Sequence, residues 1–156
     1  MTYQIDQSGK IEQTSKNTVL CLANNRRFAL LMKAKTKRQL QEVFRRNGQI
    51  RNFVLFTFCA CLSLLLKKSN FRLDNVTIDQ EYFGRESVIK EILLEILRKE
   101  KRLTRVDFAQ IGRRVNAHKF AYLVFIRKLK PNTVINFVEI LNQIKKTEVG
   151  KRLKDA

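Results

Sequence analysis

Residues 2–32 read TYQIDQSGKIEQTSKNTVLCLANNRRFALLM, in which short segments rich in apolar residues are separated by turn-forming residues. The segments of strand length are 2–6, 17–22 and 28–32. Ser8-Gly9 and Asn24-Asn25 are typical of the tight turns that join neighbouring strands. The stretch therefore predicts three consecutive strands that form an antiparallel meander.

Helical and strand-like patterns follow one another downstream of this meander. Helical spacing is found in 37–46, 53–66, 85–101, 116–129 and 133–146, and strand spacing in 75–82 and 106–111. Thr36 is a candidate N-cap for the first helix, and Asn47-Gly48 suits its end. This order predicts an α/β fold, with a mixed five-stranded sheet (β-β-β-α-β-α-β-α) covered by helices and with the two late strands parallel. We expect one domain over residues 1–150 and a frayed, charged tail over 151–156.

The segment 53–66 (FVLFTFCACLSLLL) is an uncharged run of 14 residues with basic residues on both sides. As a helix it would extend over about 21 Å, whereas the hydrocarbon layer of a membrane is about 30 Å thick. We therefore expect a buried core helix, no membrane association and a cytoplasmic protein, since the polar N-terminus lacks a secretory signal. A small membrane-associated protein anchored by this run is the alternative. Cys21, Cys59 and Cys61 contain no C-x-x-C pair and suit the core of a protein in a reducing compartment.

Basic residues outnumber acidic residues by 32 to 14, which gives a formal net charge of +18. The excess is +10 over residues 1–70 and +8 over 71–156, so it is not confined to one tail. Such a field attracts polyanions, and we expect nucleic acid, either DNA or RNA, to be the partner. An anionic membrane surface, or simply a solvated basic face, is the alternative. The residues predicted to contact phosphates are Lys35, Lys37, Arg38, Arg45, Arg46, Arg113, Arg114 and Lys119.

Three acidic residues of this basic chain lie on the first and fourth predicted strands, namely Asp6, Asp79 and Glu81. Asp79 and Glu81 are two residues apart, so a strand would point both side chains to the same face. Asp6 on an adjacent strand would complete a cluster of hard oxygen ligands suited to Mg²⁺ or Mn²⁺. The other interpretation is that each acid is a solvated or ion-paired carboxylate at a strand end.

The stretch Ile5-Asp6-Gln7-Ser8-Gly9, together with the element order over about residues 1–130, resembles the ribonuclease H-like superfamily of ribonucleases H, Holliday-junction resolvases and integrase-type enzymes. The resemblance implies that the first strand is central and carries a metal-binding Asp, and that the fourth strand beside it carries a second acid. It also implies an active-site role for His118, which opens the helix after the fifth strand. A surface or capping histidine is the other interpretation. The superfamily's acid on the first helix has no clear counterpart here, since Glu42 is the only acid in that segment.

The first hypothesis is therefore a metal-dependent nuclease or resolvase-like phosphodiesterase that acts on nucleic acid. Asp6, Asp79 and Glu81 would hold Mg²⁺ or Mn²⁺, and His118 would ligate metal or shuttle a proton. The second hypothesis is a non-catalytic nucleic-acid-binding module on the same fold, in which the acids are structural. A homodimer is compatible with either hypothesis.

We predict that affinity for nucleic acid falls steeply with salt, because basic side chains that neutralise phosphates release condensed counterions. For duplex DNA the slope of log K against log salt is about −0.9 for each phosphate neutralised. Titration of labelled duplex and single strands at several salt concentrations measures this slope. An affinity that is absent at low salt, or that does not change with salt, would contradict the prediction.

Overall fold

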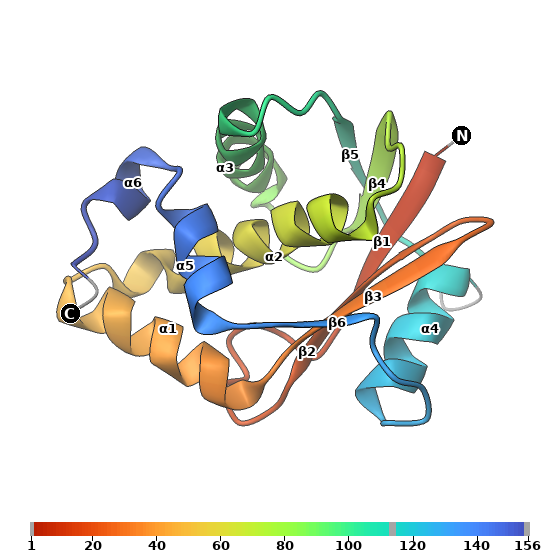
Figure 1. Ribbon diagram of the computed structural model, residues 1–156, viewed down its shortest axis with the longest axis horizontal. Coiled ribbons are helices and arrows are strands. Elements are labelled where there is room, and N and C mark those ends of the chain that lie inside the picture. The colour runs from red at the N-terminus through yellow and green to blue at the C-terminus, as the bar shows by residue number, and fades with distance from the viewer. Residues whose placement is uncertain (1, 113–114, 155–156) are drawn as a thin grey trace.

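The computed structural model describes residues 2–112 and 115–154, which form one sheet with helices on both of its faces (Figure 1). The strands are β1 (Thr2–Ser8), β2 (Thr18–Ala23), β3 (Arg27–Met32), β4 (Asn75–Asp79), β5 (Arg105–Ala109) and β6 (Thr133–Ile135). The helices are α1 (Ala34–Arg46), α2 (Phe53–Ser69), α3 (Glu86–Lys99), α4 (Asn116–Phe125), α5 (Phe137–Ile144) and α6 (Glu148–Lys151), with a short 3-10 turn, η1 (Ile50–Asn52).

The strand order across the sheet is β5-β4-β1-β2-β3-β6, so β1 lies in the middle. The first three strands form the expected antiparallel meander, because β1 pairs with β2 and β2 pairs with β3 in antiparallel fashion. The late strands are parallel, as expected, since β4 pairs in parallel with both β1 and β5. The predicted α/β class with a mixed sheet is therefore confirmed.

The prediction of five strands and of a helix over 133–146 is wrong, because the described residues include a sixth strand. Thr133–Ile135 pairs in parallel with Leu30–Met32 at the edge of the sheet, and α5 begins only at Phe137. Asn136 starts this helix, because its side chain accepts a hydrogen bond from the backbone N–H of Glu139 at 2.9 Å and forms a capping box. A strand of three residues directly before a helix is too short to show the alternation of apolar and polar residues that identifies a strand in a sequence.

Several element boundaries also differ from the predicted ones. Helix α1 begins at Ala34 rather than Lys37, so Thr36 lies inside its first turn and is not the N-cap. The segment after Lys151 is not a free tail as far as it is described. The side chain of Leu153 is buried, and the backbone N–H of Lys154 donates to Asn47 Oδ1 at 2.8 Å. The chain therefore returns to the end of α1 before residues 155–156, which lie outside the described residues.

Alternating side chains of the central strands supply two separate apolar cores, one on each face of the sheet. Leu20 and Leu22 of β2 pack into the larger core, which α1, α2, α3 and α5 complete. Cys21 and Ala23 of the same strand point to the opposite face, where they pack against α4. Figure 1 shows α4 alone on its side of the sheet, with the other long helices on the far side. Helix α4 is thus the one long helix that packs on this face of the described sheet.

The apolar run expected to form a core helix does so, as α2, which packs against β2 and β3 and against α3 and α5. The segment Ile50–Ser69 is long and apolar enough to cross a membrane, but 67% of it is buried inside the fold. Ser63 lies within this apolar helix, and its hydroxyl accepts a hydrogen bond from Gln143 Nε2 at 2.9 Å. The helix therefore contacts protein on most of its circumference.

We predict that Leu62→Ala in α2 lowers the free energy of unfolding by about 2 to 5 kcal/mol, because the change leaves a cavity around a side chain with no exposed surface. Urea denaturation of both proteins measures the difference. Val138→Ala on α5 is the control, since Val138 is 61% exposed and its truncation should change stability by less than about 0.5 kcal/mol. A Leu62→Ala variant as stable as this control would contradict the packing of α2.

Candidate metal centre and basic surface

The register between β1 and β4 brings Asp6 and Asp79 side by side. Ile5 pairs with Ile78 in this parallel ladder, so the next residue on each strand stands at the same level. Neighbouring strands lie about 4.8 Å apart, and equivalent positions point to the same face. The two aspartates therefore meet at the carboxyl ends of adjacent strands in the middle of the sheet.

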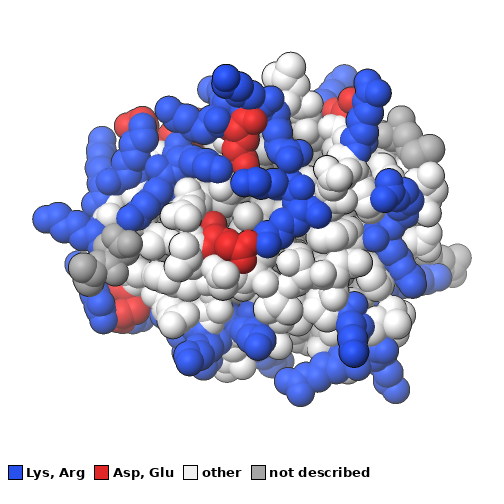
Figure 2. All heavy atoms as spheres, viewed as in Figure 1, with Lys and Arg blue, Asp and Glu red and all other residues white. Residues whose placement is uncertain are grey.

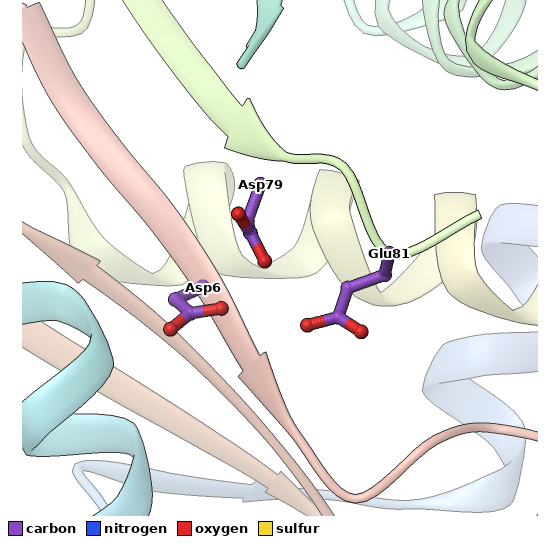
Figure 3. Close-up of side chains that lie close together, drawn as sticks. All are labelled: Asp6, Asp79 and Glu81. Carbon is purple, nitrogen blue, oxygen red and sulfur yellow. The ribbon is translucent and has the colours of Figure 1, made fainter. Parts of the chain in front are cut away.

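Glu81 reaches the same place by a different route from the predicted one. The strand β4 ends at Asp79, so Glu81 does not share a strand face with it. Instead the backbone N–H of Glu81 donates to the Asp79 carbonyl at 2.9 Å, which forms a tight bend directly after the strand. Oxygen atoms of the three carboxylates lie within 4.8 Å of one another (Figure 3). In the described part of the chain, this is the one cluster of three such groups that could hold a metal ion.

Backbone N–H groups hold both aspartates in place. Asp6 Oδ1 accepts from the N–H of Gln7 at 2.8 Å, and Asp79 Oδ1 accepts from the N–H of Ile111 at 2.7 Å. Ile111 follows β5, so three neighbouring parallel strands contribute to the arrangement. These hydrogen bonds restrict the rotation of the two carboxylates.

His118 lies in the first turns of α4, above Asp6, where its Nδ1 is 2.6 Å from Asp6 Oδ2. The Asp6 side chain is only 2% exposed, whereas that of His118 is 37% exposed. The histidine therefore covers the aspartate and connects it to solvent. Its other ring nitrogen, Nε2, has no hydrogen-bond partner among the described residues, which leaves it open to a ligand. A histidine that donates one ring N–H to a carboxylate has its orientation and tautomer set by that contact.

Burial and mutual repulsion make the cluster unfavourable when all three carboxyls are ionised. Burial raises the pKa of Asp6, and the charge of Asp79 raises it further. Burial likewise raises the pKa of Glu81 to about 7, helped by a hydrogen bond shared with Asp79 and by the charges of Asp79 and Asp6. A carboxyl whose pKa is higher in the folded protein than in the unfolded chain, where it is about 4, stabilises the fold at pH values below about 4. That stabilisation is lost as the pH rises through the pKa of the folded protein. A bound cation would remove this cost.

Gln7 is a member of the site that the sequence did not indicate. Its side chain is 7% exposed and lines the same small hollow as Asp6, Asp79 and Glu81. Its Nε2 donates to the Gly9 carbonyl at 3.0 Å and to the Tyr82 hydroxyl at 3.3 Å, while its Oε1 is buried and has no partner among the described residues. The three carboxylates by themselves make an all-oxygen donor set, which fits Mg²⁺ or Mn²⁺.

The basic residues predicted to contact phosphates lie in different environments. Lys35 and Lys119 are exposed, and Arg38 is exposed while its guanidinium donates to the Thr14 carbonyl at 2.9 Å. Arg45 and Arg46 both form ion pairs with Glu42, at 2.8 and 3.1 Å. The only acid of α1 therefore lies on the surface and does not join the cluster. Arg113 and Arg114 lie outside the described residues. Figure 2 shows Lys and Arg around most of the periphery of the visible face, with acids in small isolated groups.

Lys37 cannot contact a phosphate in this structure, because its side chain is fully buried. Its ammonium group donates to the carbonyls of Lys10 and Gln13, at 2.9 and 3.1 Å, in the loop between β1 and β2. Burial lowers the pKa of Lys37 to about 8. The residue therefore ties α1 to the loop that follows the Asp6 strand, and its basic segment 33–38 gave no sign of this role.

Comparison of the chain with protein-family models, with curated proteins and with solved structures finds no match. The functional argument therefore depends on the geometry of this chain. Its two main features are an oxygen-rich cluster at the centre of the sheet and a surface dominated by positive charge.

We predict that Mn²⁺ or Mg²⁺ raises the melting temperature of the protein, because a cation relieves repulsion that exists only in the folded state. At a concentration of 100 times Kd the stabilisation is about 2.7 kcal/mol, or about 5 to 10 °C for a chain of this size. Asp6→Asn should abolish the shift. The control Asp107→Asn removes an acid that is 55% exposed on β5, and it should keep the shift. Equal shifts in both variants would show that the cluster is not the binding site.

Proposed function

We propose that this protein is a nucleic-acid-binding, metal-dependent phosphodiesterase, of nuclease or resolvase type. The observation that carries the proposal is the convergence of Asp6, Asp79 and Glu81 at the carboxyl ends of two central parallel strands. Carboxylates so close together repel one another and also repel phosphate, so a binding surface tolerates them best when a cation neutralises them. In a chain with a net charge of +18, such a cluster suits a site that handles a phosphate through metal.

Each residue of the cluster has a definite part in this proposal. Asp6, Asp79 and Glu81 would hold the ion. When bound, Mg²⁺ or Mn²⁺ would polarise the phosphodiester and lower the pKa of the attacking water. His118 keeps Asp6 in position through the contact between Nδ1 and Oδ2 and presents Nε2 toward solvent, where it could accept or donate a proton.

The arrangement of the strands supports a ribonuclease H-like interpretation of the fold. In the superfamily that the sequence resembles, the first strand is central and the fourth lies beside it with a second acid. Here β1 lies between β2 and β4, and β4 ends in Asp79. Helix α4 follows β5 and brings His118 to Asp6, which is the position that the resemblance assigns to the last active-site residue.

A non-catalytic nucleic-acid-binding module is the second candidate, and the hydrogen bonds of the cluster favour it. Both oxygens of Asp6 already contact protein groups, through Gln7 and His118, and Asp79 accepts from Ile111. Carboxylates with such partners can remain ionised or share a proton without a metal. The acid of α1, Glu42, does not join the cluster. Cleavage assays separate the two candidates.

We predict that Asp6→Asn abolishes cleavage while affinity for nucleic acid is unchanged or increased. The substitution removes a metal ligand and also removes a negative charge that faces the phosphates, so activity and affinity should change independently. The measurement is cleavage of duplex, hybrid and branched substrates with Mg²⁺, Mn²⁺ or a chelator, with binding titrations alongside. Asp79→Asn should give the same pattern.

Asp107→Asn is the matched control, because it makes the same chemical change at an exposed acid of β5 and should leave cleavage unaltered. If wild-type protein cleaves no substrate with any metal, and the cluster variants change only stability, the non-catalytic binding module becomes the better description.

A further inference from the structure

The turn between β2 and β3 is a rigid, basic corner of the sheet. Asn24 Nδ2 donates to the Thr2 carbonyl at 2.9 Å, and the Tyr3 hydroxyl donates to Asn25 Oδ1 at 3.1 Å. Both bonds tie the turn to the start of β1. Arg26 and Arg27 complete the turn and are exposed. The corner is thus held from one side while its two cationic side chains remain accessible.

Each of these arginines lies against an aromatic ring, on opposite faces of the sheet. The guanidinium carbon of Arg26 lies 4.1 Å from the centroid of the Phe71 ring, and that of Arg27 lies 4.4 Å from the centroid of Phe120 on α4. Stacking restricts the planar group but leaves its N–H donors free at the edge. Arg27 is therefore oriented before any ligand binds.

Arg27 also lines a hollow between the turn and α4, with a volume of about 480 Å³. Helix α4 contributes Asn116, Lys119 and Phe120 to its wall, and the turn contributes its asparagines and arginines. Among the described residues, no acid lines this hollow. Within residues 2–112 and 115–154, no carboxylate forms an ion pair with Arg26, Arg27 or Lys119. The hollow therefore has two cationic side chains, Arg27 and Lys119, without a counter-charge among the described residues, whereas Arg26 at its edge stacks on the other face of the sheet.

The hollow lies on the same face of the sheet as the aspartate cluster. Cys21 pairs with Asp6 across the β1–β2 ladder, and Ala23, two residues further along β2, lines the hollow. Two residues of a strand extend over about 7 Å. Helix α4 contributes His118 to the cluster and the next residue, Lys119, to the hollow. A single nucleic-acid strand is long enough to contact both places at once.

We propose that this hollow binds a backbone phosphate of the nucleic-acid strand whose neighbouring phosphodiester lies at the carboxylate cluster. This inference rests on the proposed function and specifies how that site would hold its substrate. Arg27 would donate to two phosphate oxygens with its oriented fork, and Lys119 would contribute a point charge. The side-chain amides of Asn25 and Asn116 offer further donors at the rim. The cluster would act on one phosphodiester, and the hollow would set the register of the nucleic-acid strand by binding a neighbouring phosphate.

The test uses full-length Arg27→Gln, Lys119→Gln and Arg27→Lys, with Lys90→Gln as the matched control. Lys90 is exposed on α3, across the sheet from α4, so its substitution removes the same charge from an unrelated place. Binding of labelled single-stranded and duplex oligonucleotides is titrated at several salt concentrations, with circular dichroism to verify folding. Vesicles containing phosphatidylserine serve as a second polyanionic probe.

We expect Arg27→Gln and Lys119→Gln each to lose about tenfold in affinity and to reduce the salt slope by about one, whereas Lys90→Gln changes both quantities little. Arg27→Lys should be intermediate, since it keeps the charge and loses the fork. Folded variants that match Lys90→Gln on nucleic acid, or that lose only vesicle binding, overturn the phosphate pocket and leave the proposed function in place. Wild-type protein that binds no oligonucleotide at low salt overturns the proposed function itself.

Discussion

The parallel pairing of β1 with β4 is the constraint on which the acidic cluster of this molecule depends. The ladder aligns Ile5 with Ile78, which places both isoleucines in the larger core and the aspartates that follow them on the opposite face. A slip of one residue would exchange the two faces, burying a carboxylate among apolar side chains and exposing isoleucine. The apolar core therefore enforces the register that brings the acids together.

The larger core and the smaller core have different consequences for the site. The larger core, with α2 at its centre, supports the sheet from one side with apolar contacts. The smaller core consists of little more than α4 on the middle strands, and neighbouring positions of this helix place His118 at the acidic cluster and Lys119 at the basic hollow. Among the described residues α4 is the only long helix on its face of the sheet, so its position determines how the acidic cluster and the basic hollow lie relative to each other.

The charges of this protein form a positive exterior and a small negative centre, which is the cluster of Asp6, Asp79 and Glu81. The exterior attracts a polyanion from a distance, and the centre would repel it locally unless the carboxylates are neutralised. Placing the three carboxylates close together costs free energy. Hydrogen bonds from Gln7 and Ile111 and the contact with His118 reduce this cost without removing it. The raised pKa values of Asp6 and Glu81 reflect what remains of that cost.

The residue pattern of a segment was sufficient to predict its secondary structure wherever that segment interacts mainly with its immediate neighbours. The meander, the buried helix at 53–66 and the parallel late strands were predictable, because strand alternation, turn residues and apolar runs are properties of short stretches. The strand β6 was not, since three residues acquire strand structure only by pairing with β3. Glu81 was predicted in the cluster for the wrong reason, because a tight bend after β4 and not the strand face returns its carboxylate to Asp79.

The sequence by itself determined the charge of this protein, its α/β class and the identity of the acids available to a metal. Those properties follow from composition and from periodicity within single segments. Only the tertiary structure decided which charged residues lie together and which are buried or paired elsewhere. Lys37 is buried in the fold, Glu42 is paired on the surface, and Gln7 and Arg27 contact residues more than 70 positions away. Burial, hydrogen bonding and stacking between distant segments depend on how the chain folds back on itself, and a pattern within one segment does not specify them.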